Sequence, residues 1–128
     1  WQNWVEFSDK RKADNVSNEI ILLSKRIHDD AIKEFQLKSE YVNYTPTTFT
    51  LNVPKQQRKK VFAYVIVRKE VKIYVIHKEI CPENASPHKN PDRYPDSHFI
   101  ILKNEADYNN TVLDMIKASY ATVFHYYE

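Results

Sequence analysis

The sequence contains no glycine among its 128 residues. Glycine reaches left-handed backbone conformations without a steric penalty, and it lets backbone N–H groups close around an anion. Phosphate-cradling loops, the dinucleotide-binding fingerprint and the glycine-flanked nucleophile elbow all depend on it. The sequence therefore excludes P-loop nucleotide hydrolases, Rossmann cofactor domains, glycine-loop kinases and hydrolases built on that elbow. Its turns must use Asn, Asp and Pro instead.

Length and charge predict one compact domain. A chain of 128 residues with 42% hydrophobic residues can build one core and is too short for two. No apolar run approaches the roughly 18 to 20 residues that cross a bilayer, so no membrane association is expected. The net charge is only +2, so any binding of nucleic acid must come from local clusters of basic residues. Because the chain starts at Trp1, we expect it to be cut from a longer protein.

Cysteine usage favours a cytoplasmic location. Cys81 is the single cysteine, so no intrachain disulfide can form, whereas secreted domains of this size usually carry several. The sequence also contains glycosylation sequons, which we interpret as a by-product of an Asn-rich composition. The sequons begin at Asn15, Asn43, Asn84 and Asn109.

Hydrophobic periodicity predicts a helix at each end of the domain. Residues 1–16 contain a charged run and are expected to be a lead-in segment, followed by a single α+β domain over 17–128. Ser17 is a suitable N-cap, and Asn104 with Asp107 has the spacing of a capping box. Apolar residues follow each cap at helical spacing. In the first helix they are Ile20, Leu23, Ile27, Ala31 and Phe35, and in the second Val112, Ile116, Tyr120, Val123 and Phe124.

Between the helices the hydrophobic period changes to two, which predicts strands. The predicted strands are 48–53, 61–67, 71–76 and 98–102, with a tight hairpin joining the second and third. Residues 81–97 contain four prolines and are expected to form a long loop. The fold class predicted is α+β, an antiparallel β-meander of about four strands flanked by an N-terminal and a C-terminal helix.

The hairpin also resembles a known family. Phe62–Ile76, a strand, an Arg-Lys turn and a strand, is similar to a bacterial domain family of unknown function described as "predicted transport protein". An Asn90-Pro-Asp92 loop, the strand at His98 and a helix ending in Ile116–Tyr120 follow in that family's order. The family's loop usually carries glycine, which this chain lacks. Its members are often fused to restriction-type nuclease or defence modules, so the resemblance implies an accessory domain of such a protein.

Basic and aromatic residues gather around the hairpin. Alternating cations and rings are what phosphate contacts and base stacking require. The alternative interpretation is a solvated strand edge whose lysines discourage pairing with other chains. The candidate nucleic-acid-binding residues are Arg58, Lys59, Lys60, Arg68, Lys69, Lys72, Tyr64 and Tyr74.

Other chemistry has weaker support in the sequence. Zinc ligands usually come in tight pairs, and the spacings of His77, Cys81, His88 and His98 are loose, so no metal site is predicted. Cys81 has no predicted helix N-terminus beside it to activate the thiol, so we expect an ordinary free cysteine rather than a nucleophile. No cofactor is expected.

A metal-dependent nuclease is a further alternative. Glu70 and Lys72 have the spacing of the E-x-K half of such a site, but a second carboxylate is required. It would have to come from Asp92 or Asp96, later in the chain.

The sequence therefore predicts a non-catalytic recognition domain that contacts nucleic acid through the basic hairpin. Its expected partners are nucleic acid and the nuclease or other domains of the same longer chain. The main alternative is a protein interaction or oligomerisation module that docks through aromatic residues near the two ends, which are common interface anchors. These are Trp1, Trp4, Phe7 and the segment 124–127.

Overall fold

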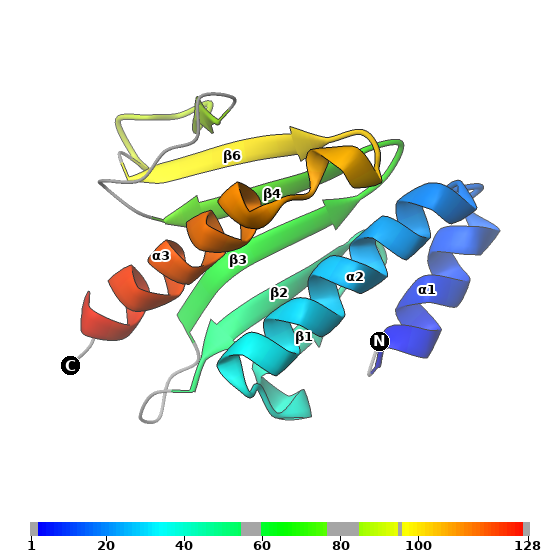
Figure 1. The fold of residues 1–128 in the computed structure, drawn as a ribbon, viewed down its shortest axis with the longest axis horizontal. Helices are drawn as coiled ribbons and strands as arrows, with labels where there is room; N and C mark the ends of the chain where they lie inside the picture. The colour runs from blue at the N-terminus through cyan, green and yellow to red at the C-terminus, as the bar shows by residue number, and fades with distance from the viewer. Residues whose placement is uncertain (1–2, 55–59, 77–84, 95, 127–128) are drawn as a thin grey trace.

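The computed structural model describes residues 3–54, 60–76, 85–94 and 96–126, and Figure 1 shows their arrangement. The helices are α1 (Trp4–Ala13), α2 (Asn18–Phe35) and α3 (Asn110–Tyr126), with the short 3₁₀ turns η1 (Ser39–Tyr41) and η2 (Glu105–Asp107). The strands are β1 (Val42–Tyr44), β2 (Thr48–Val53), β3 (Lys60–Val67), β4 (Val71–Ile76), β5 (Ser86–Pro87) and β6 (Ser97–Leu102).

The six strands form one sheet in the order β1-β2-β3-β4-β6-β5, and every neighbouring pair is antiparallel. This confirms the α+β class and the antiparallel meander. The strand count exceeds the four expected because β1 and β5 pair at the two edges of the sheet. Both edge strands are only three and two residues long, too short to show an alternating pattern in the sequence.

The helices pack on one face of the sheet (Figure 1). Alternate strand residues such as Phe49, Val65, Ile73 and Ile100 are buried against α2 and α3. The predicted apolar stripe of α2 is confirmed, and the Ser17 hydroxyl accepts a hydrogen bond from the Ile20 N–H. Within the described residues, no helix is long and apolar enough to cross a membrane.

A β-bulge in β3 is held by Ser119 of α3. The pairing of β2 with β3 skips Phe62, because Leu51 pairs with Ala63 and Asn52 with Val61. The extra residue lets both Phe62 and Ala63 lie in the core, after which Tyr64 points to the other face. The buried Ser119 hydroxyl donates to the Phe62 carbonyl at 2.5 Å and accepts from the Ile76 N–H at 2.8 Å.

Residues 1–16, expected to be a lead-in, contain α1, which packs beside α2. Phe7 is fully buried in the common core. Arg11 is buried as well, and its guanidinium donates to the Val67 carbonyl at 3.0 Å and to the Asp14 carboxylate. The inward face of α1 thus includes an arginine, which is why the sequence showed a charged run rather than an apolar stripe.

The C-terminal helix begins later than predicted. Asn104 does act as an N-cap, but it caps only the turn η2, where its side chain accepts from the Asp107 N–H. The helix α3 starts at Asn110, and the Asn109 side chain accepts from the N–H groups of Thr111 and Val112. Asn104 was predicted as the cap of this helix, but Asn109 satisfies the same local rule and occupies that position.

Candidate functional site

The sheet face opposite the helices, called here the open face, carries a row of aromatic side chains. Tyr64 of β3 pairs with Tyr74 of β4, and Tyr74 pairs with Phe99 of β6. Paired residues of antiparallel strands point to the same face, so the three rings form one line across three neighbouring strands, called here the aromatic row. Tyr64 is 43% exposed, a large value for a ring in a central strand.

Lys72 lies beside this row on the same face. Its ammonium lies 4.3 Å from the centre of the Phe99 ring and 5.1 Å from that of Tyr74. The Tyr74 and Phe99 ring centres are 5.3 Å apart. The cation and rings stabilise one another, which holds a positive charge next to an aromatic surface.

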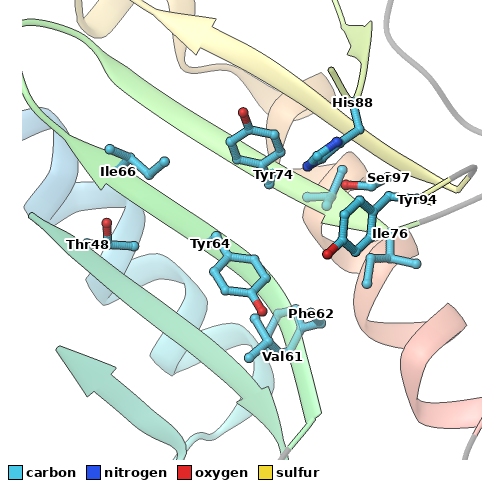
Figure 2. A pocket seen from close by; sticks show the side chains of 11 residues that line it. Thr48, Val61, Phe62, Tyr64, Ile66, Tyr74, Ile76, His88, Tyr94 and Ser97 are labelled. Atoms are coloured by element: carbon cyan, nitrogen blue, oxygen red, sulfur yellow. The ribbon is translucent and has the colours of Figure 1, made fainter. Parts of the chain in front are cut away.

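A groove of about 550 Å³ opens at the aromatic row, and Figure 2 shows the side chains around it. Tyr64, Tyr74 and Ile76 contribute from the sheet, whereas His88 and Tyr94 come from the loop between β5 and β6. The His88 ring centre lies 5.5 Å from that of Tyr74 and 4.6 Å from that of Tyr94. The loop thus builds an aromatic wall at one end of the row.

The tautomer of His88 follows from one hydrogen bond. The Asn90 backbone N–H donates to His88 Nδ1 at 3.0 Å, so this nitrogen accepts. In a neutral imidazole, the other nitrogen then carries the hydrogen. His88 Nε2–H is therefore a donor, and in Figure 2 the imidazole points into the groove.

The charge of the sheet favours anionic ligands. Among the described strand residues there is no Asp or Glu, whereas Lys60 and Lys72 are both present. Arg93, next to Tyr94 in the sequence, places its guanidinium 5.4 Å from the Tyr94 ring centre. The acidic residues of the described chain thus lie in helices, turns and loops. The open face is apolar with positive charge beside it.

The structure spreads the predicted cations over the length of the hairpin. Lys60 begins β3, and Arg68 and Lys69 lie in the turn at its other end. At about 3.3 Å per residue, Lys60 and Arg68 are about 26 Å apart. Only Lys72 adjoins the rings, and Arg58 and Lys59 lie outside the described residues. The predicted residues therefore line a strip along the sheet rather than one compact cluster.

A second hollow, of about 510 Å³, lies at the hairpin turn. Arg68 and Lys69 line it together with Arg11, Asp14 and Thr47. Since Asp14 pairs with the Arg11 guanidinium and with Lys10, much of the charge of the arginine is already compensated. The uncompensated positive charge at the hairpin turn therefore comes mainly from the exposed Arg68 and Lys69.

The structure does not bring together Glu70 and Asp96 of the alternative nuclease site. Glu70 directly precedes β4, whereas Asp96 directly precedes Ser97, which pairs with Ile76 at the other end of β4. The two carboxylates are therefore separated by roughly the 20 Å length of that strand. No group of three metal-binding side chain types gathers among the described residues.

The predicted thiol and histidine ligands also separate. His77 and Cys81 lie outside the described residues. His88 lies in the groove on the open face, while His98 pairs with Val75, a residue that points toward the helices. The two described histidines thus belong to opposite faces of the sheet.

The aromatic residues near the N-terminus belong to the core instead of a docking surface. Phe7 is completely buried, and Trp4 is half-buried with its ring centre 4.7 Å from His28 and 5.9 Å from Phe49. Phe124 is half-buried and packs on the core, and Trp1, Tyr127 and the side chain of Tyr126 are not described. The described part of this aromatic set supports the fold rather than a partner site.

A buried polar chain lies on the helix side, away from the open face. His28 Nδ1 lies 3.0 Å from the Asp29 carboxylate, and Nε2 lies 2.7 Å from the Tyr44 hydroxyl. Burial lowers the pKa of His28 and raises that of Tyr44 to about 12. A tyrosine with a raised pKa is not activated as a nucleophile, so we assign this chain a structural role.

Sequence reasoning identified Tyr64, Tyr74 and Lys72 but missed Phe99 and Tyr94. The alternation within the predicted strand 98–102 could have identified Phe99, because it precedes the buried Ile100 and therefore points to the opposite face of the sheet. Tyr94 lies in a loop without periodicity, and its place beside His88 depends on the fold.

Fold and site together define an α+β domain with one sheet face covered by helices and the other presenting aromatic residues. Comparisons with protein-family models, curated proteins and solved structures found no match to this chain.

Proposed function

We propose that this domain binds single-stranded nucleic acid on the open face of its sheet. The observation that carries the proposal is the aromatic row, three rings on neighbouring strands whose described residues include no Asp or Glu. Exposed bases of a single strand stack on aromatic side chains, and a sheet that presents such rings is a recurrent way to bind RNA or DNA. A duplex keeps its bases stacked internally and offers no ring face to such a surface.

The cations supply the second half of the interaction. Lys72 lies beside the aromatic row, and Lys60 and the Arg68-Lys69 turn lie at opposite ends of β3. A backbone that follows β3 would meet positive charge at both ends, with Lys72, which pairs with Ile66, adding to the charge of the turn end. Arg58 and Lys59, next to Lys60 in sequence, are part of the same proposal.

We also propose that the domain is a non-catalytic accessory module of a larger restriction- or defence-type protein in the cytoplasm. This rests on the resemblance of the Phe62–Ile76 hairpin to the "predicted transport protein" family. A module of this kind would hold single-stranded nucleic acid for a nuclease or other domain of the same chain.

The test is fluorescence anisotropy with labelled single strands and duplexes of about 12 nucleotides, at about 50 and 200 mM salt. The single strand should bind more tightly, and Tyr64→Leu should weaken it about 5- to 150-fold, as loss of one stacked base predicts. Leu22→Ala is the matched control, because Leu22 is 58% exposed on the helix side. Absence of binding at low salt, or unchanged affinity in Tyr64→Leu, would refute the proposal.

A second candidate is docking of a protein on the same face, including a second copy of this chain. Ile101 is 39% exposed and lies on the open face beside Lys72, which favours an apolar contact. Light scattering of the purified domain distinguishes the two, since a dimer that Ile101→Lys converts to a monomer would support this candidate.

A further inference from the structure

The groove beside the aromatic row has the character of a pocket for one flat ring. Its walls are aromatic and aliphatic, and few polar groups face it. We propose that the groove receives a single base from the bound strand and that His88 Nε2–H reads that base. This inference rests on the proposed function, because it assigns a base preference to the same face.

The size and position of the groove suit a base. A volume of about 550 Å³ accommodates a nucleotide, and the groove continues directly from Tyr64 and Tyr74. A base that leaves the stack would pass from these rings to the wall made by Tyr94, which stands across the hollow in Figure 2. Two neighbouring bases could therefore remain stacked on the row while one enters the groove.

The charge of the groove argues against a cationic guest. Aromatic cages bind quaternary ammonium groups through ring faces alone. Here the Lys72 ammonium already lies 5.1 Å from the centre of the Tyr74 ring, and the described residues of β3, β4 and β6 include no Asp or Glu. A neutral ring attached to a phosphate fits this environment better.

His88 is held as a donor in a fixed direction. Its Nδ1 accepts from the Asn90 N–H, and the imidazole packs between the rings of Tyr74 and Tyr94. A fixed N–H donor favours a base with a carbonyl oxygen at its exposed edge. Thymine, uracil and guanine carry such an oxygen where cytosine and adenine carry an amino group, which is itself a donor.

Uracil and cytosine make the sharpest comparison, because neither ring carries the methyl group of thymine and the two differ only at positions 3 and 4. The wild-type domain should bind oligodeoxyuridylate about 5- to 150-fold more tightly than oligodeoxycytidylate, the range of one good base contact. His88→Ala should bind both with equal affinity, while Tyr64→Leu should weaken both and keep the preference. His88→Gln is the conservative variant, and its amide N–H should retain part of the preference.

The outcomes separate this inference from the proposed function. If both strands bind in a Tyr64-dependent way and wild type shows no preference, or His88→Ala keeps it, then the base pocket is wrong and the binding function stands. A second measurement is nuclear magnetic resonance of the His88 ring during titration with deoxyuridine and deoxycytidine monophosphates. Shifts with deoxyuridine monophosphate alone support the pocket even if strands do not bind, and equal or absent shifts overturn it.

Discussion

Replacing Ser119 by alanine should weaken both the fold and the open face, because one hydroxyl satisfies two buried backbone groups. It donates to the Phe62 carbonyl and accepts from the Ile76 N–H at the bulge of β3. Ser119 is completely buried, so water does not replace the lost partner without a rearrangement. Alanine would leave both backbone groups unpaired.

The expected cost follows from those two groups. A buried donor or acceptor without a partner costs about 1–3 kcal/mol. Two such groups cost about 2–6 kcal/mol, from which the better helix propensity of alanine on α3 recovers about 0.5 kcal/mol. Against a typical stability of about 5–15 kcal/mol, the loss is large. Since the bulge sets which side of β3 carries Tyr64, Ser119→Ala should also weaken binding to the aromatic row.

Urea denaturation followed by circular dichroism measures the change in the free energy of unfolding. Thr122→Ala is the matched control, because its hydroxyl donates to the Ala118 carbonyl, which the helix ladder already uses. The control should change the free energy of unfolding by about 0.5 kcal/mol or less. A Ser119→Ala protein as stable as the Thr122→Ala protein would refute the reasoning.

Three further predictions concern the core, the buried histidine and the salt dependence. Phe7→Ala should cost about 3–5 kcal/mol in urea denaturation, because Phe7 belongs to the common core; a change below about 1 kcal/mol would show that α1 is dispensable. Burial lowers the pKa of His28 below its ordinary 6.5, so the folded state resists a proton that the unfolded state takes up, and stability should fall as pH drops below about 6.5. This loss of stability should be smaller in His28→Gln, and a pH dependence identical to that of the wild type would contradict the role of His28. Lys72→Gln should reduce the slope of log affinity against log salt for a single strand by about 0.7, and an unchanged slope would exclude a phosphate contact.

The sequence predicted elements whose local pattern and tertiary environment agree. The strand Val71–Ile76 was placed without error, because its residues alternate strictly between the buried and the half-buried side. Helix α2 was predicted for the same reason, with its cap at Ser17. In both elements, the residues that follow the hydrophobic period are also the residues that pack in the core.

The rest depended on contacts that no local window contains. The inward face of helix α1 carries the buried Arg11, which donates to the carbonyl of Val67 on a distant strand and to the nearby Asp14 carboxylate. The groove needs the loop carrying His88 and Tyr94 to fold back over Tyr74. Tyr64 and Tyr74 were predicted as candidate contacts, but the strand pattern alone did not show which face of the sheet the helices cover.

The dimensions of the sheet explain why the helices cover only one of its faces. Six strands at a spacing of about 4.8 Å make a sheet about 24 Å wide, and packed helices lie about 10 Å apart. Helices α2 and α3, with α1 at the side, are therefore enough for one face only. In such a sheet, apolar strand residues that point away from the helices have no core to pack against. Folding alone would favour threonine or lysine at these positions. Tyr64, Tyr74 and Phe99 occupy those positions instead, so their rings are best explained by a ligand that stacks on them.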